Sequence, residues 1–396
     1  MAIPLTRKGL SSLLLSLLVL FSALPAEGQW YRRAQPAEPP VEVQPEATPE
    51  PQRPTTPPPP IVLDAHVDSL HRILDRGDDL SETLMDGQVD LNKLRIGGVN
   101  VVWFALWVDQ DKFKGEAATK RALALYEALQ NQVARHSDRL VFCRTAADVR
   151  RAASEGKIAA LAGIENGSAI NNDLRLISTF HNMGVTRMVI TWRGNLPWAA
   201  ASQADNPKQG LSALGKEVIR EMNRVGMVVD LSHSSKQTAL DALDASSLPV
   251  IFSHSNASSI CPHPRNIDDE LLQRLKQNGG VVGVNFYDKF VRPARKNILD
   301  RRQPTLDDVL DHLDYMVKMA GIDHVGIGSD WDGGIIPAVG LENASHMPSL
   351  FEGMRRRGYV EGDIRKVAGE NFLRVLETNE QGARKEIDLP PVPPLR

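Results

Sequence analysis

Several features that mark other classes of protein are scarce in this chain of 396 residues. It has 46 lysines and arginines against 49 acidic residues, and the formal net charge of −3 offers no basic field to attract nucleic acid. Only two cysteines are present, Cys143 and Cys261, so the fold does not depend on a disulfide framework. An exported protein could pair them, but we expect two separate and mostly buried thiols.

A hydrophobic run long enough to span a membrane is also missing. The apolar stretch at residues 10–24 follows Arg7 and Lys8 and is shorter than the roughly 20 residues that a stable span needs. It ends in small residues, which predicts a secretory signal over residues 1–26, cleaved near Ala26. An uncleaved N-terminal anchor is the alternative. We therefore expect an exported protein, periplasmic or extracellular, with no stable membrane span after signal cleavage.

Lipid anchors are not expected at either end of the chain. No cysteine lies near the cleavage site, which argues against a lipid-modified N-terminus. No apolar segment closes the chain, which argues against a GPI-type anchor at the C-terminus.

Proline-rich segments flank the central part of the chain. Residues 27–60 are rich in proline, glutamate and threonine, and this composition buries little surface. We interpret them as a disordered linker behind the export signal, or as a tail with no role. Residues 383–396 form a second proline-rich tail, which leaves residues 61–382 as one domain. The hydrophobic share of 42% is ample for its core.

Short apolar runs alternate with segments of helical period between residues 61 and 382. Runs typical of buried strands lie near residues 61–66, 98–107, 158–165, 185–192, 226–232, 249–254, 280–286 and 324–330. Helical segments include residues 117–134, 173–183, 211–225, 236–243, 268–277, 305–320 (with Thr305 as the N-cap) and 361–377. Strands that alternate with helices in this way predict an α/β fold, the (β/α)8 TIM barrel, whose sites lie at the carboxyl ends of the strands.

Acidic residues and histidines stand at the ends of five of these runs. They are His66 and Asp68 after the first run, Glu165 after the third, His233 after the fifth, His254 after the sixth and Asp330 after the eighth. Because the carboxyl ends of parallel strands meet at one end of a barrel, we expect one polar site there. Imidazoles and carboxylates are the ligands of a hydrolytic zinc site. The pattern therefore favours a metal-dependent hydrolase.

Each residue also has a plainer interpretation when it is taken alone. His66 and Asp68 can reach one ion because alternate side chains of a strand point the same way, but such a pair is more often a coincidence in a loop. Glu165 has two oxygens and can bridge two metals, or it can form an ordinary salt bridge at a strand end.

The remaining candidates divide in the same way. His233 and His254 follow adjacent strands and suit a second ion, whereas either one alone is more often a structural histidine. Asp330 could take a proton from metal-bound water and pass it to a leaving amine. Asp332 is its rival for that role, and the alternative is that both aspartates cap the following segment.

Taken together, these motifs resemble the membrane (renal-type) dipeptidases, which are binuclear zinc hydrolases on a TIM barrel. The resemblance runs over nearly all of residues 61–377 in the same order. It rests on Asp64-Ala65-His66-Val67-Asp68, Gly163-Ile164-Glu165-Asn166-Gly167, Asp230-Leu231-Ser232-His233, Val250-Ile251-Phe252-Ser253-His254-Ser255, Arg265-Asn266, Val284-Asn285-Phe286-Tyr287 and Gly328-Ser329-Asp330-Trp331-Asp332-Gly333.

The resemblance implies two zinc ions per chain. His66, Asp68 and Glu165 would hold one ion. Glu165, His233 and His254 would hold the other, with Glu165 as the bridge between them.

The resemblance also implies a substrate site. Arg265 matches the arginine that binds the terminal carboxylate of the substrate, and Asp330 matches the acid/base carboxylate. Trp192 and Asn195 complete the expected substrate contacts. His263 lies two residues before Arg265, and we expect it to be an exposed loop residue.

Trp192 departs from the family pattern, which has at this position a histidine that contacts the substrate and stabilises the developing oxyanion. An indole N–H can donate one hydrogen bond but cannot carry positive charge. Three consequences are open: weaker dipeptidase activity, an altered choice of substrate, or compensation by Arg193.

The function expected is an exported zinc-dependent dipeptidase that hydrolyses the peptide bond of dipeptides by a binuclear metal-hydroxide mechanism. One alternative is hydrolysis of another small amide, such as an N-acyl amino acid or a dipeptide with a D-residue. Another is a catalytically weakened protein that binds a ligand or partner. A homodimer is possible by resemblance.

Overall fold

The computed structural model of the protein describes residues 60–293 and 302–387. The expected signal over residues 1–26, the linker up to residue 59 and the end of the chain from residue 388 lie outside these described ranges. The proposed division of the chain into signal, linker, domain and tail therefore stays a prediction.

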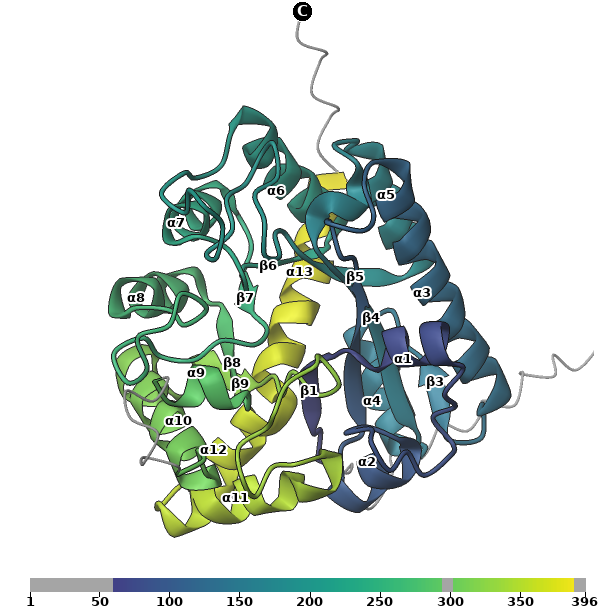
Figure 1. Ribbon diagram of the computed structural model, residues 1–396, viewed down its shortest axis with the longest axis vertical. Coiled ribbons are helices and arrows are strands. Elements are labelled where there is room, and N and C mark those ends of the chain that lie inside the picture. The colour runs from purple at the N-terminus through teal and green to yellow at the C-terminus, as the bar shows by residue number, and fades with distance from the viewer. Residues whose placement is uncertain (1–59, 294–301, 388–396) are drawn as a thin grey trace, which may run out of the picture. The chain divides into compact units, whose positions relative to one another are not determined.

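Eight parallel strands form a nearly closed barrel in the centre of the domain (Figure 1). In hydrogen-bonded order they are β1 (Leu63–Val67), β2 (Val101–Trp107), β4 (Ile158–Glu165), β5 (Val185–Val189), β6 (Val228–Asp230), β7 (Ile251–Phe252), β8 (Val281–Val284) and β9 (Val325–Ile327). Backbone bonds join β1 to the chain after β9, because Asp68 N donates to Trp331 O at 2.9 Å and Asp330 N donates to His66 O at 3.1 Å. The predicted (β/α)8 fold is confirmed.

A ninth strand, β3 (Leu140–Phe142), lies outside the barrel and was not predicted. It pairs with the first half of β4, at residues 158–160, whereas β5 pairs with the second half, at residues 162–165. The long strand β4 therefore has room for both neighbours on the same edge.

Helices surround the barrel and connect its strands (Figure 1). They are α1 (Ser69–Arg76), α2 (Leu91–Gly97), α3 (Glu116–Arg135), α4 (Ala146–Ser154), α5 (Arg175–Met183), α6 (Ala213–Val225), α7 (Lys236–Ala245), α8 (Asp269–Asn278), α9 (Asp288–Val291), α10 (Leu306–Ala320), α11 (Met347–Arg356), α12 (Glu361–Arg365) and α13 (Asn371–Ile387). Short turns of 3₁₀ helix lie at η1 (Gly167–Ile170), η2 (Ile322–His324) and η3 (Ala344–His346), and a π-helical turn, η4 (Lys366–Glu370), joins α12 to α13. None of the helices in the described ranges is long and apolar enough to cross a membrane.

The start of α10 illustrates how the sequence sets a helix boundary. Thr305 is the N-cap, as predicted, and its backbone N–H donates to the carboxylate of Asp308 at 2.8 Å. The hydroxyl of Thr305 donates to the same carboxylate at 3.0 Å. Contacts of this kind fix the start of the helix, where backbone groups lack partners within the helix.

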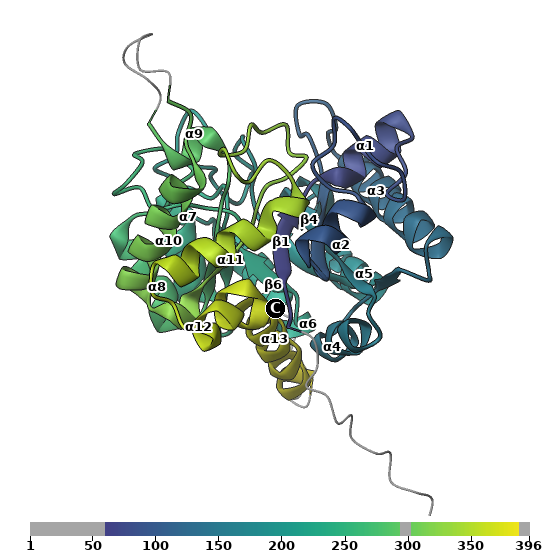
Figure 2. The same cartoon turned by 90° about the horizontal axis from the view of Figure 1, so that it is seen from below.

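The last helix covers the end of the barrel at which the strands begin. Phe372 and Leu376 of α13 belong to one buried apolar cluster with Leu63, Val101 and Val281 from the first residues of three strands. Figure 2 shows α13 at the lower end of the barrel and α9 at the opposite end. The carboxyl ends of the strands are therefore left for a site.

Two further expectations can be compared with the structure. The helix α13 runs to Ile387, so residues 383–387, which we assigned to the tail, continue a helix. Cys143 and Cys261 are both buried and free, as expected.

Candidate metal centre and substrate cavity

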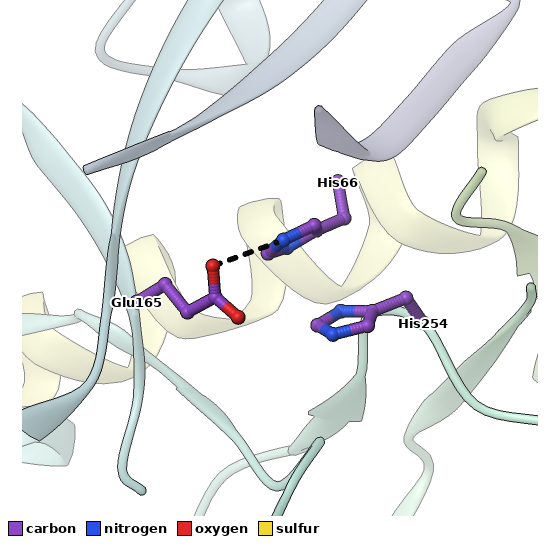
Figure 3. Close-up of side chains that lie close together, drawn as sticks. All are labelled: His66, Glu165 and His254. Atoms are coloured by element: carbon purple, nitrogen blue, oxygen red, sulfur yellow. Dashed lines mark ion pairs between the residues drawn. The ribbon is translucent and has the colours of Figure 1, made fainter. Parts of the chain in front are cut away.

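Strands β1 and β4 bring His66, Asp68 and Glu165 into contact at the carboxyl end of the barrel. Nε2 of His66 lies 3.3 Å from Oδ2 of Asp68 and 3.3 Å from Oε2 of Glu165. Figure 3 shows His66, Glu165 and His254 pointing toward one another from three separate parts of the barrel. The first expected ligand set is therefore assembled in space.

The other oxygen of Glu165 faces the histidines that follow β6 and β7. Oε1 of Glu165 is 3.1 Å from Nε2 of His233, and that nitrogen is 3.0 Å from Nε2 of His254. The two oxygens of one buried carboxylate thus serve two different histidines, the arrangement that a bridging ligand requires.

The chemistry of these donors fits bound metal ions. Nε2 of His66 is buried and has no hydrogen-bond partner among the described residues. A neutral imidazole has one donor and one acceptor nitrogen, so the facing Nε2 atoms of His233 and His254 need a proton or a cation between them.

Donor atoms that lie within 4.8 Å of one another form the groups His66–Glu165–His254 and His66–Asp68–Asp330. This division of the residues differs from the one that the family resemblance implies.

The buried charges of the cluster favour a positive charge among them. Burial acts to lower the pKa of His66, but the charges of Glu165 and Asp68 outweigh it and raise that pKa to about 10. Burial and the charge of His66 hold the pKa of His254 well below its usual value. Burial also lowers the pKa of His233 to about 3, with the charge of Arg265 adding to the effect. A cation would therefore be stabilised by the buried carboxylates. His233 and His254 stay neutral, and neutral imidazole is the form that ligates metal.

Arg187 supports the cluster from inside the barrel, and the sequence reasoning did not single it out. Its Nη1 donates to Oδ2 of Asp230 at 2.7 Å, and its Nη2 lies 3.1 Å from Nδ1 of His66. All three side chains are fully buried. A Cβ at Gly163 would lie 2.5 Å from Cγ of Arg187, so glycine in β4 makes room for the arginine. The sequence signal that could have identified Arg187 is its position as a charged residue within the buried strand β5.

Asp230 links the two segments that carry His233 and His254. Its Oδ1 accepts the backbone N–H of Ser232 at 3.1 Å and that of Ser253 at 3.0 Å. One buried carboxylate therefore fixes the backbone just before each histidine.

Asp330 lies at the edge of the cluster, beside the cavity. Its Oδ2 accepts a hydrogen bond from Nδ2 of Asn285 at 3.0 Å. Burial raises the pKa of Asp330 to about 6, against the lowering effects of His66 and Asn285. Its backbone is left-handed, with φ of 68°, and that of His233 is too, with φ of 70°. Such conformations cost energy in residues other than glycine, and they gather at functional sites.

Asp332, the rival of Asp330, makes structural contacts instead. Its Oδ1 accepts the backbone N–H of Gln88 at 2.7 Å, and its Oδ2 accepts the hydroxyl of Ser69 at 2.5 Å. Both of its oxygens are thus used to fix neighbouring loops.

A cavity of about 530 Å³ opens above the cluster. Its lining includes Asp68, Glu165, His233 and Asp330 from the cluster and Trp107, Trp192, Arg193, His263, Arg265, Lys289 and Phe290 around it. The rings of Trp107 and Trp192 meet edge to face, with centroids 5.2 Å apart. Trp107 was missed by the sequence reasoning, although it stands at the end of the run 98–107, where the same rule would have found it.

Arg265 is buried in the cavity wall, with 2% of its surface exposed. Its Nη2 donates to the backbone oxygen of His254 at 3.3 Å, and its Nε has no partner among the described residues. Burial lowers its pKa to about 10, so it still carries its charge at neutral pH.

One expectation about a neighbouring loop differs from the structure, and the expected substrate contact of Asn195 stays a prediction. His263 is half-buried and lines the cavity, with its ring centroid 4.6 Å from that of Phe290. The expectation that His263 is exposed is therefore wrong. Asn195 is not among the residues that line the cavity. Its Oδ1 accepts the backbone N–H of Ala201 at 2.9 Å and so holds its own loop.

A parallel barrel with histidines and carboxylates gathered at its strand ends defines the class of metal-dependent hydrolases. The sequence profile described as membrane dipeptidase, peptidase family M19, matches residues 59–388. The chain belongs to this family and is, by class, a metallo-dipeptidase.

Individual relatives agree with the family assignment. Dipeptidase tcpJ of Claviceps purpurea is 34% identical over 343 residues, which cover 83% of this chain and 79% of that protein. The crystal structure of a dipeptidase of family M19 superposes with a TM-score of 0.74 at 29% identity, covering 81% of this chain and 99% of that one. A metallopeptidase from Rhodobacter sphaeroides, solved with a phosphinate mimic of the dipeptide L-Ala-D-Ala, gives a TM-score of 0.73 at 28% identity, with coverage of 81% and 99%.

Proposed function

We propose that the protein is an exported zinc-dependent dipeptidase that uses two metal ions per chain. The observation that supports this best is the position of Glu165, whose two oxygens contact two different histidines, His66 and His233. A single metal needs no such bridge, whereas two metals about 3.5–4 Å apart do.

His66, Asp68 and Glu165 would hold one ion, and Glu165, His233 and His254 the other. Three imidazoles in the set favour zinc over magnesium, which prefers oxygen ligands. Zinc held by these residues would supply a Lewis acid for the scissile carbonyl and would lower the pKa of water to about 7.

Asp330 is the proton carrier of the proposed reaction. Its pKa of about 6 lies close to neutral pH, so its carboxylate can accept a proton from the attacking water and return it to the departing amine. The hydrogen bond from Asn285 fixes one oxygen of Asp330 and leaves the other for this transfer.

Arg265 would bind the C-terminal carboxylate of the dipeptide. Its guanidinium is buried, carries a donor without a partner among the described residues, and faces the cavity. An arginine in such a place pairs with a carboxylate in two-pronged fashion and limits the length of the substrate.

Trp192 supplies a donor where the family has a histidine. Its indole N–H can hydrogen-bond to an oxyanion, but without a positive charge, so this contact is weaker than that of an imidazolium. The guanidinium of Arg193 stacks on this indole, with Cζ 4.7 Å from the ring centroid of Trp192.

A dipeptide with a D-residue is the second candidate substrate. The relative from Rhodobacter sphaeroides was solved with a mimic of L-Ala-D-Ala, and the Trp107–Trp192 wall shapes the pocket differently from a histidine.

The test is steady-state hydrolysis of L-Ala-L-Ala, L-Ala-D-Ala and N-acetyl-L-alanine by the purified full-length protein. We expect turnover of at least one dipeptide and none of the N-acetyl amino acid, which lacks a free amine. Hydrolysis of the N-acetyl compound alone would favour the small-amide alternative. Bound metal without turnover of any compound would favour a binding protein.

A further inference from the structure

Two further cations line the cavity together with Arg265. Arg193 lies in the loop after β5, and Lys289 lies in α9. Both side chains are exposed to the solvent of the cavity, which they line together with Arg265.

Two aromatic rings connect the site of Arg265 to that of Lys289, because Cζ of Arg265 lies 5.3 Å from the ring centroid of Phe290, which lies 4.8 Å from that of Tyr287. Burial is the main cause that lowers the pKa of Arg265, and the charge of Arg193 acts in the same direction. Burial likewise lowers the pKa of His263 to about 4, with the charges of Arg265 and Lys289 adding to the effect. Positive charge is therefore concentrated on this side of the cavity.

Neither Arg193 nor Lys289 has a carboxylate partner among the residues that the structure describes. Arg193 stacks on Trp192, and Lys289 lies over Tyr287, with Nζ 5.5 Å from the ring centroid. Lys112, elsewhere in the lining, is the contrast, because its Nζ lies 3.2 Å from Oδ2 of Asp109.

The other carboxylates that line the cavity belong to the candidate metal-ligand cluster and do not pair with Arg193 or Lys289. Asp68, Glu165 and Asp330 belong to the cluster at the strand ends. One terminal carboxylate of a substrate, bound to Arg265, would still leave the charges of Arg193 and Lys289 without a counterion. Unpaired cations beside a substrate site attract a second anionic group and disfavour a cationic one.

We propose that the cavity selects dipeptides whose C-terminal residue is aspartate or glutamate, with Arg193 and Lys289 binding the side-chain carboxylate. The inference rests on the proposed function, because it takes Arg265 as the partner of the terminal carboxylate. The acidic side chain is assigned to the C-terminal residue because Arg193 and Lys289 line the same cavity as Arg265, and because the rings of Phe290 and Tyr287 connect Arg265 to Lys289.

The test compares L-Ala-L-Glu with L-Ala-L-Gln, which have the same length and nearly the same shape. With the full-length zinc-loaded protein in buffer of low ionic strength, we expect kcat/KM to be about tenfold higher for L-Ala-L-Glu, since two partly exposed ion pairs each contribute modestly. The ratio falls as salt is raised, because salt screens exposed charges.

Variants show which side chains cause the difference in kcat/KM between L-Ala-L-Glu and L-Ala-L-Gln. Arg193→Gln and Lys289→Gln each lower the ratio about threefold, and the double variant brings it close to one. Lys120→Gln, which removes an exposed cation that does not line the cavity, keeps the wild-type ratio. Because each ratio compares two substrates on one protein, partial loss of folded or metal-loaded protein cancels.

The outcomes separate this inference from the function beneath it. Equal kcat/KM for the two dipeptides in the wild-type protein, or a preference that survives the double variant, would overturn the proposed selectivity and leave the dipeptidase function standing. If neither these nor any neutral dipeptide is hydrolysed, the proposed function fails, and the selectivity fails with it.

Discussion

At the scale of single residues, two aspartates two positions apart have different environments. Asp330 lines the cavity beside the histidines, whereas both carboxylate oxygens of Asp332 accept hydrogen bonds, one from Gln88 and one from Ser69. Both adopt left-handed backbone conformations, with φ of 68° and 65°. Contacts rather than conformation therefore distinguish the proposed proton carrier from the residue that holds the loop.

Replacement of Asp330 separates chemistry from binding. We expect Asp330→Asn to lower kcat by about 10³-fold, within the range of general acid–base catalysis, while zinc content stays at the wild-type level. Asp332→Asn is the matched control. It should lower the free energy of unfolding by about 1–2 kcal/mol, because a buried hydrogen-bonded charge is lost, and it should change kcat far less. Equal losses of kcat in the two variants would refute the assignment.

Trp192 makes a second residue-scale prediction. Trp192→His restores a side chain that can carry charge near the developing oxyanion, so we expect kcat to rise about tenfold, less than the 10²–10³-fold attributed to a complete oxyanion donor. Trp192→Phe keeps an aromatic wall against Trp107 but removes the N–H, and it should lower kcat. Steady-state kinetics on one dipeptide decide the matter. A Trp192→Phe variant as active as the wild type would show that the indole donates nothing to the reaction.

Site residues at the ends of strands could be predicted from the sequence, whereas residues in loops could not. His66, Asp68, Glu165, His233 and His254 come together because each lies at or shortly after the carboxyl end of a strand, and the chain direction of a parallel barrel brings those ends to one place. Asn195 and His263 lie in loops, whose paths depend on contacts such as the one between Asn195 and Ala201, and no periodicity encodes these contacts.

At the scale of elements, the periodicity of apolar residues predicted the barrel strands and the main helices. It did not predict the short elements. The strand β3 has three residues, too few to show an alternation, and it is held by pairing with β4. Runs such as 226–232 proved longer than the strand within them, because β6 covers Val228–Asp230 and the apolar residues beyond it are buried in loops.

A carboxylate links the segment after α1 to the end of α3. Asp79 Oδ1 accepts from the backbone of Ser81 at 2.8 Å and lies 2.7 Å from Nε2 of His136. Partial burial acts to raise the pKa of Asp79, but the hydrogen bonds from Ser81 and the contact with His136 outweigh it and hold that pKa well below its usual value.

The depressed pKa of Asp79 predicts a pH-dependent contribution to stability. Because the folded-state pKa lies below the unfolded value of about 3.9, the contribution is present above that pH and is lost as pH falls through the folded pKa. We expect Asp79→Asn to lower the free energy of unfolding by about 1 kcal/mol at pH 7. Urea denaturation at a series of pH values measures the difference between the two proteins. A difference that stays constant down to strongly acidic pH would contradict the assignment.

At the scale of the whole molecule, the two ends of the barrel have different tasks. The end at which the strands begin is filled by Phe372 and Leu376 of α13, and a Cβ at Gly326 would lie 2.4 Å from the ring of Phe372. The opposite end carries the buried polar cluster and the cavity. A packed apolar end gives the polar end a rigid base, on which donor atoms can be held in place.

Export makes a prediction about the whole chain. We expect the protein recovered from an exporting host to begin at Glu27, because small residues precede that position. N-terminal sequencing of the secreted or periplasmic fraction identifies the first residue. Recovery in the membrane fraction with the first 26 residues retained would support the uncleaved anchor instead.

The central claim is that this barrel hydrolyses dipeptides by means of two zinc ions. The most direct measurement is the rate of dipeptide hydrolysis as zinc is added back in steps to protein freed of metal by exhaustive chelation. The account predicts no activity in the metal-free protein and a rise that levels off at about two equivalents of zinc per chain. Activity that survives complete chelation would contradict the metal mechanism, and full activity at one equivalent would contradict the bridging role of Glu165.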